Sequence, residues 1–134
     1  MTFSLSGDEI LGAHGEVEHV VSESMTAIAA GSGDLPVLAT PTLVAHMEAA
    51  ACRALQHHLP GGLTSVGSRI DVRHLAPSPI GVQVTSRAVV TDVQGAKITF
   101  DVTATHHHAG STIEIGRGAH VRVVVERGAF LNAL

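Results

Sequence analysis

The chain has 134 residues, 45% of them hydrophobic and 2% aromatic, and its formal net charge is −4 with histidine neutral. That length fits one domain over residues 1–134 with a single core, and it leaves no room for a second. Eight basic residues are scattered among twelve acidic ones, and there is no Trp or Tyr to stack on bases. This composition argues against a nucleic-acid partner.

The N-terminal segment and the cysteine content bear on the compartment. Asp8 and Glu9 stand where a signal peptide would carry basic residues, and no apolar run approaches the length of about 18 residues that a membrane span needs. Cys52 is the single cysteine, so an internal disulfide cannot form. We therefore expect a cytoplasmic protein without membrane contact.

The predicted elements run in the order strand, helix and four strands. Valines alternate with Glu and His from His14 to Glu23, and a Gly- and Ser-rich stretch from Gly31 to Leu38, either a lid or a loop, interrupts that strand pattern. A helix follows, with Thr40 as N-cap, Pro41 at its first position and residues 60–62 as its stop. The period then falls to about two, which predicts strands at 63–75, 80–93, 97–107 and 111–126, hairpin turns at 92–95 and 108–110, and a stiff corner at 76–79.

One long helix laid on about five antiparallel strands is an α+β architecture in which one face of the sheet covers the helix. The edges of such a small sheet and its mostly aliphatic outer face favour pairing with a second copy. We expect a homodimer, and the pattern leaves open whether two dimers join into a tetramer.

Glu48 lies among uncharged residues in the predicted helix. Its neighbours three and four positions away are Val44, Ala45, Ala51 and Cys52, and the polar residues of the helix lie on another side. The pattern predicts that Glu48 points inward. A buried carboxylate without a cation costs several kcal/mol and has a raised pKa, which is typical of functional sites. The alternatives are a structural, hydrogen-bonded carboxyl or one that reaches solvent at an oligomer seam.

Further candidate residues each have a structural alternative. His74 comes just before the predicted corner and is an acid or base candidate, yet ten histidines occur and a strand-end histidine is often on the surface. Gly67 interrupts a strand, which indicates a bulge or the close approach of a ligand. The run His106–His108 sends neighbouring side chains to opposite faces and has no accompanying ligand set, so no metal site is expected.

Motifs from about residue 37 to the tail at residues 130–132 resemble the fluoroacetyl-CoA-thioesterase-like group of hot dog proteins. Three spacings coincide with that family's pattern: eight residues from Thr40 to Glu48, twenty-six from Glu48 to His74, and seven from Gly67 to His74. The motifs are Ala39-Thr40, Met47–Cys52, Gly67, Val72-Arg73-His74, the corner at 76–79 and Glu114–Arg122.

The resemblance implies a hot dog fold, in which an antiparallel sheet wraps a long central helix, and hydrolysis of a short or medium acyl-CoA without metal or redox cofactor. It carries the family's catalytic residues over to Thr40, Glu48 and His74, and its substrate-contacting glycine to Gly67. The family member that selects fluoroacetyl-CoA has phenylalanines ahead of the helix, and residues 31–38 contain none. Selectivity for fluorine is therefore not implied.

The family's sites lie at a dimer interface, and this bears on how the residues work together. On one helix Thr40 and Glu48 would be roughly 12 Å apart, so we expect Glu48 of one copy to face the helix N-terminus of the other. Thr42 is the expected backbone donor to the thioester carbonyl, because Pro41 has no N–H. Glu48 would act as nucleophile or general base, and His74 would stabilise charge or protonate the leaving thiolate.

Three other functions are compatible with parts of the pattern. The chain could bind an acyl-CoA or another carboxylic ligand without hydrolysing it, since a fold does not fix a function. It could be a dehydratase or isomerase, although such enzymes usually place an Asp or His against the enoyl chain. It could also be a structural dimer whose histidines bind metal adventitiously.

Overall fold

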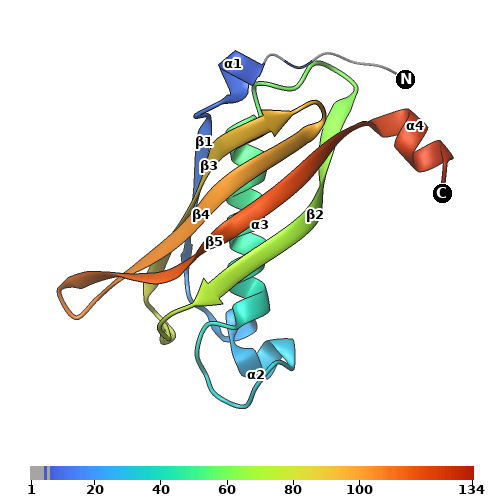
Figure 1. The fold of residues 1–134 in the computed structure, drawn as a ribbon. Helices are drawn as coiled ribbons and strands as arrows, with labels where there is room; N and C mark the ends of the chain where they lie inside the picture. The colour runs from blue at the N-terminus through green and yellow to red at the C-terminus, as the bar shows by residue number, and fades with distance from the viewer. Residues whose placement is uncertain (1–4, 6) are drawn as a thin grey trace.

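The computed structural model describes Leu5 and residues 7–134; residues 1–4 and 6, in the segment used above to predict the compartment, lie outside the described residues. Figure 1 shows a long helix against a five-stranded sheet. Among the described residues, no helix has the length and hydropathy needed to cross a membrane. The elements are α1 (Gly7–Ile10), β1 (His14–Val20), η1 (Glu23–Met25), α2 (Ala27–Ala30), α3 (Thr40–Leu55), β2 (Leu63–His74), β3 (Gln83–Gln94), β4 (Lys97–His108), β5 (Ser111–Glu126) and α4 (Arg127–Asn132).

The sheet has the strand order β1-β3-β4-β5-β2, and every neighbouring pair is antiparallel. Helix α3 lies across one face of this sheet, and α4 follows the end of β5 and lies outside the sheet (Figure 1). The arrangement confirms the predicted α+β architecture of one long helix and about five antiparallel strands. It also makes β2, which follows α3 in sequence, an edge strand.

The core forms between the inner face of α3 and the sheet. Alternate residues of β3 and β4 point toward the helix and are buried, as the period of two predicts. At Gly15 in β1 an added Cβ would overlap the backbone carbonyl of Ala50, so the helix backbone rests directly on that strand. The buried residues of α3 are Leu43, Met47, Ala50, Ala51, Ala54 and Leu55.

Several element boundaries differ from the predicted ones. Strand β3 begins at Gln83, three residues after its predicted start, and the predicted ends of β2, β3 and β4 are each wrong by one residue. The N-cap of α3 is Ala39, whereas the sequence predicted Thr40, and Thr40 is the first helical residue. The helix ends at Leu55, before the predicted stop, because the N–H of Gln56 already bonds three residues back to Arg53. Strand β1 ends at Val20, and η1 replaces the predicted end of that strand. Both predicted hairpin turns are confirmed, with positive φ angles at Gly95, Ala109 and Gly110.

The Gly- and Ser-rich stretch ahead of α3 is a loop tied down at its C-terminal end. Val37 forms a β-bridge with Pro79, and Leu38 forms one with Thr26. Its residues from Gly31 to Pro36 are exposed. The loop is therefore fixed where it joins α3 and open to solvent before that point.

A stacked histidine pair joins β1 to α3. The rings of His19 and His46 lie 3.6 Å apart with an interplanar angle of 4°. Burial, and next the charge of His19, lower the pKa of His46 to about 4. Protonating His46 would place a positive charge in a half-buried position against the ring of His19.

We expect acid to destabilise the fold through this pair. Because the pKa of His46 is lower in the folded than in the unfolded chain, the unfolded chain binds more protons between about pH 6.5 and pH 4. The stabilisation is complete above about pH 6.5 and is lost as pH falls through this window. Melting temperatures measured across it should fall less steeply for His46→Phe than for wild type. The control is His57→Phe, at an exposed position, which should keep the wild-type pH dependence. A His46→Phe protein with the same pH dependence as wild type would contradict this account.

Candidate active site

Thr40 and His74 meet where α3 begins and β2 ends. Thr40 Oγ1 lies 2.8 Å from His74 Nδ1, and this contact uses the hydroxyl that the sequence assigned to capping the helix. Burial lowers the pKa of His74, and a backbone hydrogen bond at Ala76 opposes that shift. The neutral ring is therefore the main form near pH 7. His74 Nε2 is buried and has no hydrogen-bond partner in the described part of the chain.

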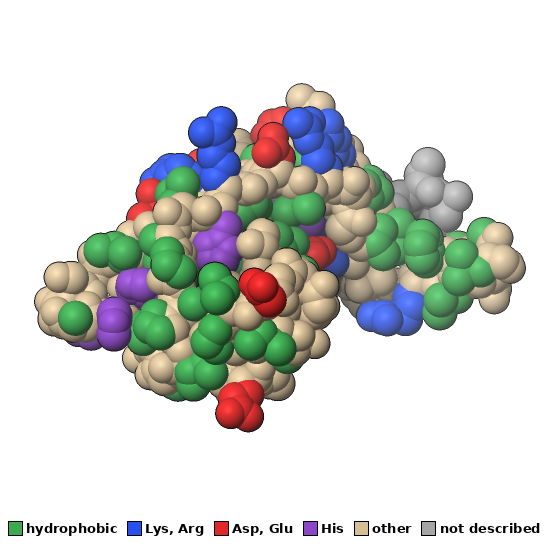
Figure 2. All heavy atoms as spheres, turned by 90° about the horizontal axis from the view of Figure 1, so that it is seen from below, with side chains coloured by type: hydrophobic (Ala, Val, Ile, Leu, Met, Phe, Trp, Pro, Cys, Tyr) green, Lys and Arg blue, Asp and Glu red, His purple; other side chains and the backbone are tan. Residues whose placement is uncertain are grey.

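A cavity of about 340 Å³ opens beside this pair. Figure 2 views the end of the molecule that carries α2, where hydrophobic side chains cover much of the surface and acidic ones are scattered between them. The exposed hydrophobic residues there include Ile28, Leu35 and Leu75. The cavity is lined by Ala27, Ser32, Val37, Leu38, Thr40, His74, Leu75, Ala76 and Pro77.

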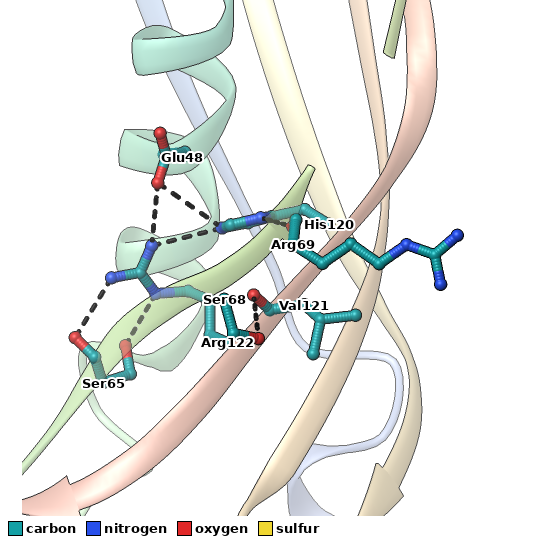
Figure 3. Close-up of polar contacts among 7 residues, drawn as sticks. All are labelled: Glu48, Ser65, Ser68, Arg69, His120, Val121 and Arg122. Atoms are coloured by element: carbon teal, nitrogen blue, oxygen red, sulfur yellow. Dashed lines mark hydrogen bonds and ion pairs between the residues drawn. The ribbon is translucent and has the colours of Figure 1, made fainter. Parts of the chain in front are cut away.

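Glu48 faces two cationic or potentially cationic side chains on β5. Its Oε2 lies 3.6 Å from Nη1 of Arg122 and 3.9 Å from Nε2 of His120 (Figure 3). The Glu48 side chain is 40% exposed. The expectation of a buried carboxylate without a cation is therefore wrong, because the cation comes from a strand that the helical pattern does not include.

Arg122 is fixed from three sides. Its Nε donates to Ser65 Oγ at 2.8 Å, and its Nη2 donates to the Ser65 carbonyl at 3.1 Å. His120 Nδ1 lies 2.7 Å from the Arg69 carbonyl, which can only accept, so His120 Nε2 is free to accept from Arg122 Nη1 at 3.2 Å. Burial first, and the Arg122 charge, lower the pKa of His120, which favours this neutral form. The guanidinium is thus a positioned positive charge beside Glu48.

Gly67 lets the carboxylate of Glu48 come close to β2. An added Cβ would lie 2.7 Å from Glu48 Oε2 and 3.3 Å from His120 Cε1. The register of β2 against β5 shifts between Gly67 and Arg69, which is the predicted bulge. The close approach that the glycine signals is made here by Glu48.

Gly67→Ala should lower activity more than stability. The new methyl would push away the end of a flexible glutamate, so we expect a small change in melting temperature. With Glu48 as the reacting carboxylate that the family resemblance implies, a displacement of about 1 Å should reduce kcat/KM roughly 10- to 100-fold. The matched control is Gly61→Ala, since no atom lies within 4 Å of a Cβ built there. Equal activity of the two variants would show that the position of Glu48 does not matter.

The predicted site residues form two groups within one chain. Thr40 contacts His74, and Glu48 lies against Gly67. Helix α3 runs unbroken from Thr40 past Glu48, so about 1.5 Å per residue separates them by roughly 12 Å along its axis. Gly67 and His74 are separated by roughly 23 Å along β2 at about 3.3 Å per residue. Thr42, the predicted carbonyl donor, is half-buried in the first turn of α3.

Sequence reasoning gave no role to His120 and Arg122. Both belong to a stretch already quoted for the family resemblance, and both are buried. The available signal was alternation: residues 120, 122 and 124 share one face of β5, and Val124 is a core residue. Two polar residues on a face that continues into the core indicate a buried polar cluster.

The histidine run of β4 divides between two environments. His106 Nδ1 lies 2.7 Å from Ser78 Oγ in a buried contact, and His107 Nδ1 lies 2.7 Å from Thr112 Oγ1 in an exposed one. Over Leu5 and residues 7–134, no three His, Cys, Asp or Glu side chains are grouped as metal ligands would be.

Comparison with known proteins identifies the family of this chain. A family model described as fluoroacetyl-CoA-specific thioesterase matches residues 21–128. The fluoroacetyl-CoA thioesterase of Streptantibioticus cattleyicolor is 35% identical over 124 residues, which make up 92% of this chain and 83% of that protein. The chain belongs to the fluoroacetyl-CoA-specific thioesterase family. Membership confirms the predicted family and the predicted class of thioester hydrolases.

Solved structures of this fold cover nearly the whole chain. The fluoroacetyl-CoA thioesterase FlK superposes with a TM-score of 0.81 at 32% identity, covering 92% of this chain and 93% of FlK. A hot-dog-like protein from Thermanaerovibrio acidaminovorans gives a TM-score of 0.82 at 27% identity, covering 94% of this chain and 92% of that one. The predicted hot dog fold is confirmed.

Proposed function

We propose that the chain hydrolyses short or medium acyl-CoA thioesters to a free acid and CoA, with Thr40, Glu48 and His74 as catalytic residues. The observation that carries this proposal is the Glu48 carboxylate, which is 40% exposed yet held beside the positioned guanidinium of Arg122. A carboxylate fixed at the surface of a thioesterase fold is available to a substrate or to water. In FlK, a variant has been solved with acetyl-CoA, which is consistent with a CoA ester as substrate here.

The active unit in this proposal is a homodimer paired along β2. This strand has twelve residues and lies at the end of the sheet, where no described strand pairs with its outer edge. An antiparallel pairing centred between Ile70 and Asp71 would bring Gly67 of one copy opposite His74 of the other. Glu48, which lies against Gly67, would then face the Thr40–His74 pair of the second copy. The two groups that one chain keeps apart would form one site.

The backbone at the start of α3 would polarise the thioester carbonyl. The first helical hydrogen bond runs from the N–H of Leu43 to Ala39, so the N–H of Thr42 precedes the bonded part of the helix. The positive end of the helix dipole lies at the same place. Both would stabilise negative charge on the carbonyl oxygen as it develops.

Glu48 and His74 would carry out the substitution at the carbonyl carbon. Glu48 either attacks this carbon, giving a mixed anhydride that water then cleaves, or takes a proton from the attacking water. The CoA thiolate leaves in both cases. Because the neutral form of His74 dominates near pH 7, we assign its Nε2 to hydrogen bonding with the reacting groups, oriented by Thr40.

The family resemblance implies hydrolysis without a metal or redox cofactor, and we expect the same of this protein. Gly67 would contact the substrate in addition to lying against Glu48. A cytoplasmic location stays a prediction.

Release of free CoA from a panel of acyl-CoAs tests the proposal. The panel runs from acetyl through decanoyl and includes fluoroacetyl and phenylacetyl. We expect saturable thiol release from at least one straight-chain ester. If no ester is cleaved but several raise the melting temperature, the protein is a binding module. Conversion of an enoyl-CoA without thiol release would indicate a dehydratase or isomerase.

A further inference from the structure

The cavity beside Thr40 and His74 has a neutral and mostly apolar wall. None of its nine lining residues carries a fixed charge, and His74 is mainly neutral near pH 7. Apart from Thr40 and His74, Ser32 is the one polar lining residue. The remaining six are Ala27, Val37, Leu38, Leu75, Ala76 and Pro77, which offer aliphatic surface and no aromatic ring. Such a wall suits an uncharged aliphatic group.

Backbone hydrogen bonds fix the two segments that form the wall, the loop before α3 and the corner after β2. The N–H of Ala27 donates to the Val37 carbonyl at 2.9 Å, and the N–H of Leu38 donates to the Ser78 carbonyl at 2.9 Å. Ser78 itself is fully buried and bonded through its hydroxyl to His106 of β4. These contacts tie the loop before α3 to the corner after β2. The cavity is therefore preformed and does not depend on a ligand to assemble it.

The cavity is too large for a two-carbon acyl group. The cavity is open to solvent on one side, and at about 30 Å³ for each water-sized group its volume of about 340 Å³ corresponds to roughly eleven such groups. An acetyl group places one methyl beyond its carbonyl carbon and would leave most of the apolar wall in contact with water. Each further methylene that enters should improve binding roughly fourfold.

We propose that this cavity holds the acyl chain, and that Ala27 and Val37 limit its length, so that uncharged aliphatic chains of about four to eight carbons are preferred to acetyl. This inference rests on the proposed thioesterase function and names its substrate class. In the paired arrangement the thioester carbonyl lies between the Thr40–His74 pair of one copy and Glu48 of the other. The chain then extends into the cavity of the first copy.

Filling the wall at Ala27 tests the inference. For wild type, kcat/KM should rise at least tenfold from acetyl-CoA to hexanoyl-CoA, and succinyl-CoA should be cleaved poorly compared with butanoyl-CoA. Ala27→Phe should reduce kcat/KM for hexanoyl-CoA at least tenfold and change it less than threefold for acetyl-CoA. The control is Ile28→Phe, on the neighbouring exposed position of α2, which should leave the chain-length profile unchanged. Val37→Phe is the second variant if Ala27→Phe does not fold.

Two results would overturn the inference while leaving the thioesterase proposal intact: a wild-type preference for acetyl-CoA, or an equal loss with both esters in the filled variants. Binding is measured in parallel as the rise in melting temperature with each ester. If no ester is cleaved, the proposed function fails. The inference then stands if hexanoyl-CoA stabilises wild type more than acetyl-CoA does and Ala27→Phe removes that difference, and it fails otherwise.

Discussion

Glu48→Gln is expected to lower kcat by at least about 100-fold, the lower end of the effect of a positioned general base. Glutamine keeps the shape of the side chain and removes the negative charge that, in the proposed mechanism, either attacks the carbonyl carbon or takes a proton from water. Stability should change by less than about 1 kcal/mol, because the pair with Arg122 is partly exposed at the glutamate. Steady-state CoA release and thermal melting of the same preparations measure the two effects.

The matched control is Glu114→Gln. Glu114 pairs with Arg117 at 2.7 Å and is 36% exposed, so it also loses an ion pair with a similarly accessible side chain. This variant should keep wild-type turnover. A folded Glu48→Gln protein that turns over as fast as the control would remove Glu48 from the mechanism.

His74→Gln is expected to lower kcat/KM by about 100-fold, since it removes the neutral imidazole that the proposed mechanism places beside the reacting groups. Thr40→Ala should cost roughly tenfold, because the hydroxyl acts by orienting that ring. If the two residues work as one unit, the double variant should be no slower than His74→Gln alone. Rates of all three variants with one ester complete the cycle.

The pH profile separates this role from a purely structural one. Burial lowers the pKa of His74, so wild-type activity should hold down to about pH 6.5 and fall only at lower pH, as the ring becomes protonated. Wild-type activity that falls between pH 8 and pH 6.5 would contradict the neutral ring.

The double variant has its own contradicting outcome. If the losses in kcat/KM of the two single variants multiply in it, Thr40 and His74 act independently.

Local pattern predicted the fold well where the pattern was long. The alternation over sixteen residues gave β5 with its observed bounds, and glycines with positive φ fixed both hairpins. Helices α1, α2 and α4 have four to six residues each, too few for a helical period to show. Thr40 fits an N-cap by residue type, but the chain bends into the helix one residue earlier.

The candidate site was only partly predictable, because its partners are distant in sequence. Glu48 was singled out because its helical neighbours are apolar, yet the charged group beside it is Arg122. Arg122 lies on β5 opposite Gly67 of β2, so this contact depends on how the two strands pair. The helical pattern around Glu48 carries no information about this strand pairing. The Thr40–His74 contact likewise joins residues 34 positions apart.

The most direct test of a site shared between two copies is the activity of mixed dimers. Glu48→Gln and His74→Gln chains, carrying different affinity tags, are refolded or coexpressed together, and dimers with both tags are purified. Such a dimer holds one site with neither substitution and one with both, if Glu48 of one copy works with His74 of the other. We expect about half of the wild-type turnover per dimer, against at most about one hundredth for either parent. Mixed dimers no more active than their parents would contradict a shared site.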